Sequence, residues 1–204
     1  MTAALSIIDA MDDPELFQPW FRGDTWANWR AVLKGIYALP MTADEIAFFR
    51  TVADRDPPKK PVREVWAIVG RGGGKDAIAS AIASHTAALY DGSGHLRPGE
   101  RALVMCLATD REQAKIILNY IRSYFTDIEL FKGMIQRETA SGFELSNGVD
   151  VTVATNSYRS VRGRSVLCCI FDECAFGGTR TARRPTKRHS GPSGPRWREC
   201  PARS

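Results

Sequence analysis

The residues best suited to chemistry form a glycine-rich run in the first half of the chain, Gly70-Arg-Gly-Gly-Gly-Lys75-Asp76. Glycines allow the backbone to curl so that successive N–H groups face one anion, and Lys75 adds a mobile cation. The helix-forming sequence that follows would direct its positive end to the same point. The run therefore predicts a polyphosphate-binding loop, and its binding residues are Gly70, Arg71, Gly72, Gly73, Gly74, Lys75 and Asp76.

This run departs in two ways from the common phosphate-loop pattern G-x-x-x-x-G-K-[ST]. Gly70 and Gly74 are one residue too close together, and Asp76 replaces the hydroxyl residue. The usual hydroxyl gives Mg²⁺ one neutral ligand, whereas a carboxylate coordinates but adds negative charge near the phosphates. Asp76 is therefore a candidate metal ligand, and we expect Asp76→Ser to leave nucleotide binding intact or to tighten it. A glycine-rich surface turn is the alternative interpretation.

Two carboxylates follow a second apolar run, much later in the chain. Ser165-Val-Leu-Cys-Cys-Ile-Phe171 predicts a buried strand, and Asp172 and Glu173 come directly after it. In strand–loop–helix nucleotidases the first such acid holds Mg²⁺ and the second polarises the attacking water. Taken alone, the pair is more simply surface charge. Because the ligand crevice of an open parallel sheet lies at the carboxyl ends of its strands, the two runs together predict an ATPase fold.

Length and composition limit the size of the core and the class of protein. A chain of 204 residues can bury one core and a small accessory segment. No apolar run approaches the ~18 residues needed to cross a bilayer, and Asp9, Asp12 and Asp13 stand where an export signal is basic. The odd number of cysteines favours reduced thiols that pack as small apolar groups. A zinc site matches no familiar spacing; its candidate ligands would be Cys168, Cys174, His189 and Cys200.

Strand-like and helix-like runs alternate along the chain and predict an α/β fold with parallel core strands. The segment before the glycine run is expected to be helical, with Asp24 as one cap and a Thr42–Glu45 capping box. A hairpin is expected to turn at Asn147-Gly148. The other predicted elements are strands at 64–69, 101–107 and 165–171 and helices at 76–90 and after Asp110.

With these elements placed, the chain resembles the ATPase half of a large terminase subunit, the motor that packs DNA into the heads of tailed bacteriophages. The resemblance spans roughly residues 26–176 and rests on the run Gly70–Lys75, on Asp110-Arg-Glu-Gln-Ala114, and on Arg162-Gly163 upstream of Phe171-Asp-Glu-Cys-Ala-Phe176. The shortened glycine loop is typical of that family. The resemblance implies a P-loop NTPase-type, mostly parallel sheet flanked by helices, with ATP and Mg²⁺ as cofactors. It also implies a metal-dependent nuclease domain, for which we identify no sequence here.

The resemblance further implies roles for individual residues. Lys75 would bind the β- and γ-phosphates, Asp172 would hold Mg²⁺, and Glu173 would activate water. Arg71 stands where an arginine stabilises the γ-phosphate, since a guanidinium makes two-point contact with developing oxyanions; a solvated loop arginine is the alternative. Arg162 would either sense phosphate or DNA or brace its loop.

Two tryptophans before the glycine run also have two interpretations. Trp26 and Trp29 would either cover an adenine ring or, as is commoner for aromatic residues three apart on a helix, pack in the core. The partners that the resemblance implies are double-stranded DNA, a phage portal and a small terminase subunit. A homo-oligomeric ring, no membrane contact and a cytoplasmic location in a bacterial host are also expected.

The sequence changes character after Phe176. Residues 177–204 contain eight Lys or Arg and one Glu, so this segment carries +7 and the rest of the chain −2. Its low apolar content and lack of periodicity predict a disordered basic tail. With one base restored at Phe176, a neighbouring reading frame becomes acidic and helix-compatible. We therefore interpret the tail as the out-of-frame end of a truncated gene product, because local and global signals disagree there.

Three parts are expected: an N-terminal helical segment and linker at 1–62, an incomplete P-loop ATPase core at 63–176, and the tail at 177–204. The expected function is the ATPase part of a packaging motor that hydrolyses ATP with Mg²⁺ to drive DNA translocation. The truncation predicts an inactive or weakly active remnant. The alternatives are a helicase-like DNA translocase ATPase and a non-enzymatic nucleic-acid-binding protein that acts through its basic tail.

Overall fold

A five-stranded mixed sheet forms the centre of the molecule. The computed structural model describes residues 5–89, 96–97, 99–108, 111–155 and 163–172, and in these ranges the strand order is β2-β3-β4-β1-β5. β1 is parallel to both β4 and β5, whereas the β2–β3 and β3–β4 pairs are antiparallel. The strands are β1 (Ala102–Ala108), β2 (Ile135–Thr139), β3 (Gly142–Leu145), β4 (Val149–Thr155) and β5 (Ser165–Phe171). The predicted α/β class with parallel core strands is confirmed at this level.

β1 is the most deeply buried strand. None of its seven residues is more than 4 % exposed. Val104 and Cys106 belong to the main core, whereas Leu103, Met105 and Leu107 form a smaller cluster with Cys169 of β5. Side chains alternate across a strand, so both faces of β1 are apolar, as expected for a central strand of a parallel sheet.

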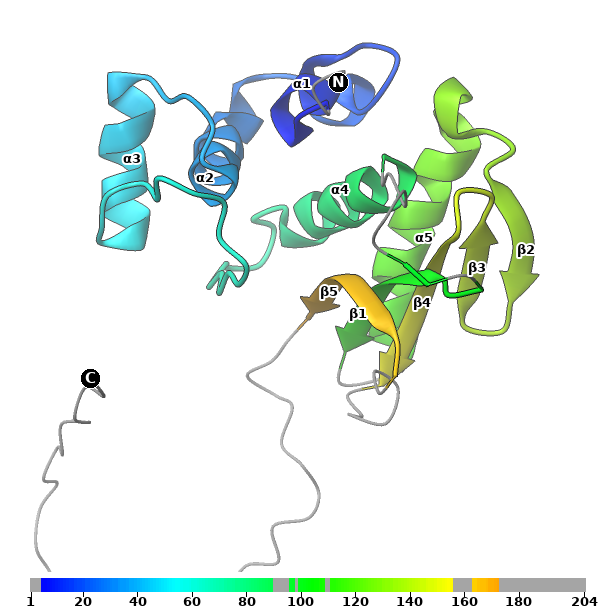
Figure 1. The fold of residues 1–204 in the computed structure, drawn as a ribbon. Coiled ribbons are helices and arrows are strands. Elements are labelled where there is room, and N and C mark those ends of the chain that lie inside the picture. The colour runs from blue at the N-terminus through cyan, green and yellow to red at the C-terminus, as the bar shows by residue number, and fades with distance from the viewer. Residues whose placement is uncertain (1–4, 90–95, 98, 109–110, 156–162, 173–204) are drawn as a thin grey trace, which may run out of the picture.

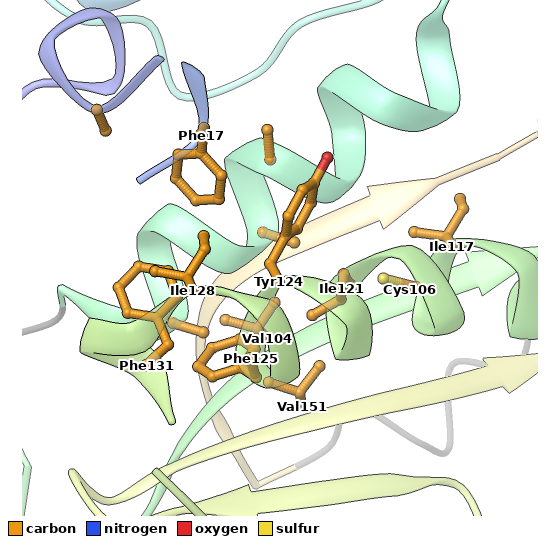
Figure 2. Close-up of a cluster of buried hydrophobic side chains, with 14 of the residues drawn as sticks. Phe17, Val104, Cys106, Ile117, Ile121, Tyr124, Phe125, Ile128, Phe131 and Val151 are labelled. Carbon is orange, nitrogen blue, oxygen red and sulfur yellow. The ribbon is translucent and has the colours of Figure 1, made fainter. Parts of the chain in front are cut away.

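Two helices cover one face of the sheet, α4 (Lys75–Ala88) and α5 (Arg111–Asp127) (Figure 1). The predicted helices at 76–90 and after Asp110 are therefore confirmed. α5 turns Ile117, Ile121 and Phe125 into the core, and Figure 2 shows them gathered above Val104 and Val151 of the sheet. No helix in the described part of the chain is both long and apolar enough to cross a membrane.

The N-terminal region shares this core. Phe17 packs edge-on against Tyr124 of α5, with ring centroids 5.0 Å apart, and against Phe131 at 5.9 Å (Figure 2). The region consists of α1 (Ile7–Asp12), the 3₁₀ helices η1 (Gln18–Trp20) and η2 (Asp24–Trp26), α2 (Ala27–Tyr37) and α3 (Ala43–Ala53), and a further 3₁₀ helix, η3 (Glu129–Phe131), follows α5. The expected helical character of residues before the glycine run is confirmed.

The two predicted helix caps have opposite outcomes. The Thr42–Glu45 capping box is present at the start of α3, because each side chain bonds the other's backbone N–H. The predicted Asp24 cap is wrong. Asp24 is itself the first residue of η2, and α2 begins after Trp26 without a side-chain cap. A short 3₁₀ turn leads directly into α2, so no capping side chain is placed at its start.

The predicted strand at 64–69 is also wrong. These residues form no strand and pair with none of the described strands. Trp66 is 76 % exposed and Ile68 is fully exposed. The linker is instead attached to α2, because Val62 N–H donates to Ile36 O at 2.9 Å. An apolar run becomes a strand only where neighbouring strands accept its backbone hydrogen bonds.

The hairpin prediction is confirmed at its turn. β3 and β4 pair antiparallel around Asn147-Gly148, and Gly148 has φ +85°, which suits a glycine in a tight turn. The strand at 165–171 is confirmed with the same bounds, although it is half-buried at the end of the strand order and not fully buried as expected. β2, which pairs with β3 at the other end of the strand order, was not predicted.

Candidate functional site

The glycine loop closes on itself before α4 begins. Gly73 N–H donates to Gly70 O at 3.2 Å, and Gly72 and Gly74 both have φ +75°. This left-handed conformation is strained for residues with a side chain, so these two positions require glycine. The run therefore adopts a tight turn of the kind that glycine makes possible.

α4 starts at this turn with its first N–H groups uncapped by any side chain. Gly74 is the N-cap residue and offers no side-chain acceptor. The first N–H groups of a helix have no intrahelical partner, and the helix dipole places partial positive charge there. The turn and the helix start together present backbone donors at one place, as an anion site requires.

Lys75 joins this loop to the end of β5. Its Nζ donates to Asp172 Oδ1 at 2.5 Å and to Asp76 Oδ1 at 2.9 Å. Asp172 is 97 residues away in sequence and directly follows β5. Its N–H donates to Leu107 O of β1 at 2.8 Å, which extends the strand pairing by one bond and fixes its position. Figure 1 shows β5 running toward the start of α4.

The charges at this point favour a protonated lysine. Burial alone lowers the pKa of Lys75, but the hydrogen bonds and negative charges of Asp172 and Asp76 outweigh it, so the pKa lies above its ordinary value. Lys75 therefore keeps its positive charge at neutral pH. The Asp172 side chain is only 13 % exposed, whereas that of Asp76 is 41 % exposed, so the contact with Asp172 is the better shielded of the two.

The carboxylates around Lys75 are of the kind that holds a metal ion together with phosphates. Within the described ranges, no group of three or more His, Cys, Asp or Glu side chains could hold a metal ion. Two carboxylates do converge on one point, because Asp172 and Asp76 share the same ammonium group. Mg²⁺ is usually held by one or two carboxylates together with substrate phosphates. The donor set therefore fits Mg²⁺ bound with a polyphosphate.

The structure brings together only part of the predicted site. Gly70, Gly72, Gly73, Gly74, Lys75, Asp76 and Asp172 form one cluster at the start of α4. Arg71 is in the same turn with its side chain exposed. Glu173 and Arg162 lie outside the described residues, as do the expected tail and three of the four candidate zinc ligands. Arg164, close to Arg162 in sequence, bonds Asp150 at the opposite end of β5.

Sequence reasoning missed the contact between the tryptophans and the glycine loop. Trp29 Nε1 donates to Gly73 O at 2.8 Å, across 44 residues of sequence. The Trp26 ring lies against Gly74. Both rings also pack against the main core, so the core interpretation is confirmed in part. The pair's three-residue spacing gave no indication that its target was the glycine loop.

A hollow of the surface lies apart from the glycine loop, beside the N-terminal helices. A cavity of about 440 Å³ opens beside η2 and the start of α2, lined by Asp12, Gln18, Phe21, Arg22, Gly23, Asp24, Ala27 and Arg30. Arg30 is already engaged there, because it pairs with Asp12 at 2.8 Å and donates to Phe21 O. Loop residues 70–73 are instead exposed at the surface.

No family model matches the chain, and neither a curated protein nor a solved structure matches it.

Proposed function

We propose that this chain is the nucleotide-binding part of a DNA-packaging motor of the large terminase type. The observation that carries the proposal is the 2.5 Å bond between Lys75 Nζ and Asp172 Oδ1. It places a glycine-rich turn, a lysine, a helix start and a strand-end carboxylate at one point. That combination serves the binding of a nucleoside triphosphate with Mg²⁺.

Each part of the site has a distinct task in this proposal. The loop N–H groups and Lys75 bind the β- and γ-phosphates, and Asp172 and Asp76 hold Mg²⁺, which neutralises charge on the phosphates. Lys75 is bonded to both carboxylates in the structure. With nucleotide bound, Lys75 would bond the phosphates in place of these carboxylates, and Asp172 and Asp76 would hold the metal. Arg71, exposed in the same turn, has access to the γ-phosphate.

Hydrolysis and translocation rest on the sequence resemblance and on Glu173 as the residue that activates water. The proposed substrate is ATP, and the proposed partner is double-stranded DNA, with a portal, a small terminase subunit and a ring of copies in the assembled motor. In this proposal the chain binds ATP but is weakly active or inactive as a motor. A helicase-like translocase would use the same loop and carboxylates.

The test is ATP binding by Lys75→Ala, measured by calorimetry with and without Mg²⁺. We expect the loss of binding in this variant, because both phosphate contact and loop charge disappear. Lys132→Ala is a matched control: Lys132 is also bonded to a carboxylate at 2.5 Å, that of Glu129, far from the loop in sequence. Glu173→Gln is expected to bind ATP but to eliminate any turnover. Parental binding by Lys75→Ala and parental turnover by Glu173→Gln would show that the site assignment is wrong.

Asp76→Ser separates the two possible effects of the unusual carboxylate. We expect ATP binding to be intact or tighter, since the substitution removes a negative charge beside the phosphates and restores a neutral ligand. A large loss would show that Asp76 is an adapted metal ligand whose carboxylate a hydroxyl does not replace. The measurement is the same calorimetric titration.

The charge distribution favours a second candidate, binding to nucleic acid through the tail. Residues 177–204 carry +7, whereas the rest of the chain carries −2. Clustered Lys and Arg bind phosphate backbones without sequence specificity. In this case deletion of 177–204 abolishes DNA binding measured by fluorescence anisotropy, and Lys75→Ala has no effect. The terminase proposal predicts that ATP binding survives that deletion.

A further inference from the structure

The glycine loop is held from outside by two tryptophans of the N-terminal region. Trp29 Nε1 donates to Gly73 O at 2.8 Å. A Cβ placed on Gly74 would lie 2.8 and 3.0 Å from ring atoms of Trp26 and 3.6 Å from Trp29 Nε1. The loop therefore has one directed hydrogen bond and one close ring contact from a part of the chain that precedes it by more than 40 residues.

The two tryptophans are themselves held in place by packing. Trp26 meets Phe21 edge-on, with centroids 4.8 Å apart, and Phe21 is fully buried. Trp29 is part of α2, and both indole rings pack against the main core. A group held by a packed element keeps its position better than one on a loop. The two tryptophans can therefore restrain the glycines, which carry no side chains to restrain themselves.

The hydrogen bond fixes the orientation of one peptide group. The described part of the chain contains no cis peptide bond, and in a trans peptide the C=O and the following N–H point in opposite directions. While Trp29 holds Gly73 C=O, the N–H of Gly74 must point away from the indole. The neighbouring Gly73 N–H is engaged with Gly70 O, so both sides of Gly73 are fixed.

We propose that Trp29 is a positioning residue for the glycine loop and that Trp26 supports it by packing on Gly74. The pair keeps the loop in its anion-binding conformation before the ligand arrives. A loop that is already ordered loses less conformational freedom on binding, which raises affinity. This inference rests on the proposed function, in which the anion is the phosphate chain of ATP.

Trp29→Phe is the direct test because it keeps an aromatic ring in α2 and removes only the indole donor and part of the ring. Trp20→Phe is the matched control: Trp20 is also partly buried, and its ring meets Tyr124 edge-on at 5.2 Å. Two measurements are made on ¹⁵N-labelled protein. The first is the backbone ¹⁵N order parameter of Gly73 without nucleotide, and the second is the dissociation constant for Mg-ATP.

In Trp29→Phe we expect the order parameter of Gly73 to fall from about 0.85 toward about 0.6. The affinity for Mg-ATP should fall about fivefold, the usual effect of losing one neutral hydrogen bond. Trp20→Phe should change neither value. A purely structural role for Trp29 would lower the unfolding midpoint without a selective change at Gly73.

The outcomes separate this inference from the proposed function. An unchanged Gly73 order parameter in Trp29→Phe overturns the inference, and so does a mobile Gly73 with parental ATP affinity. If the parent protein binds no ATP, the proposed function fails, and the order parameter alone decides whether Trp29 positions the loop. Should Trp29→Phe not fold, Trp26→Leu decides the question, since it removes the ring against Gly74 and leaves the Trp29 donor in place. We expect the same change there, but smaller.

Discussion

Strand β1 and the segment 64–69 have similar apolar sequences and opposite surroundings. β1 has strands on both sides and is buried on both faces. Segment 64–69 has no described strand beside it, and Trp66 and Ile68 are exposed. An inner strand of a parallel sheet needs hydrogen-bonding neighbours on both sides. The comparison shows that an apolar sequence is not sufficient to form such a strand.

Paired truncations should show the largest difference between the two regions. Leu103 of β1 is fully buried, so Leu103→Ala should lower the free energy of unfolding by about 2–5 kcal/mol, from lost burial and the cavity left behind. Ile68→Ala should change it by less than about 0.5 kcal/mol, as for an exposed residue. Urea unfolding followed by circular dichroism measures both. A loss above about 1 kcal/mol for Ile68→Ala would mean that the segment packs in solution.

Thiol reactivity should separate the inner strand from the outer one. Burial, together with the neighbouring Cys168 and Cys169, raises the pKa of Cys106 in β1 to about 12, and Cys169 in β5 is only half-buried. The thiolate is the reactive form. We expect Cys106 in the native protein to react with a maleimide at least ~100-fold more slowly than Cys169. Mass spectrometry of digested protein, sampled over time at pH 8, measures each site. Equal rates would mean that β1 opens as readily as β5.

The comparison also explains which sequence predictions were correct. The Thr42–Glu45 capping box and the Asn147-Gly148 turn were confirmed, because each depends on residues close together in sequence. β5 was confirmed because its run is apolar after Ser165 and pairs with β1 over most of its length. The prediction of a strand at 64–69 was wrong because the residues of a segment do not show whether neighbouring strands will pair with it. Asp24 was misassigned because a 3₁₀ turn precedes α2.

The candidate site likewise contains features that the sequence predicted and a contact that it did not. The glycine positions and Lys75 were recognisable because the loop chemistry needs those residue types consecutively. Placing both runs at the carboxyl ends of strands predicted that they share one ligand site, but not that Lys75 bonds Asp172. The expected strand before the loop is absent, but α4 and β5 still bring the two residues together. The bond from Trp29 to Gly73 depends on how α2 packs, which no local pattern records.

Glycine substitutions compare a close contact with sheet backbone and a close contact with a side chain of the segment 64–69. A Cβ on Gly142 would lie 1.9 Å from Val151 O across the β3–β4 pair, and a backbone oxygen in a sheet cannot move aside. Gly142→Ala should therefore cost about 1–3 kcal/mol of stability. A Cβ on Gly73 would meet Val69 Cγ1 at 2.4 Å, and this side chain belongs to the unpaired segment. Gly73→Ala should cost less than about 1 kcal/mol.

Thermal and urea unfolding of both variants measure the two costs. A cost for Gly73→Ala as large as that for Gly142→Ala would contradict the comparison. It would mean that the segment before the loop is held as firmly as a strand in the sheet.

The smallest effect is expected at α3, whose capping signal needs no partner strand. Thr42→Ala should cost about 1 kcal/mol, because Thr42 Oγ1 accepts from Glu45 N–H at the helix start. Thr51→Ala is the control in the same helix, where the hydroxyl only donates to Phe48 O.

Burial raises the pKa of Glu45, but hydrogen bonds from Lys34 and from Thr42 N–H, with the Lys34 charge, outweigh it and hold the pKa below its ordinary value. A carboxylate with a lowered pKa stabilises the fold above its unfolded pKa, and this contribution is lost as the pH falls through the folded value. Glu45→Gln should therefore lower the free energy of unfolding at pH 7 and have a smaller effect at pH 3, measured by urea unfolding at both. An equal effect at the two pH values would mean that the Glu45 charge does not stabilise α3, and that the local signal acts through the neutral hydrogen bonds alone.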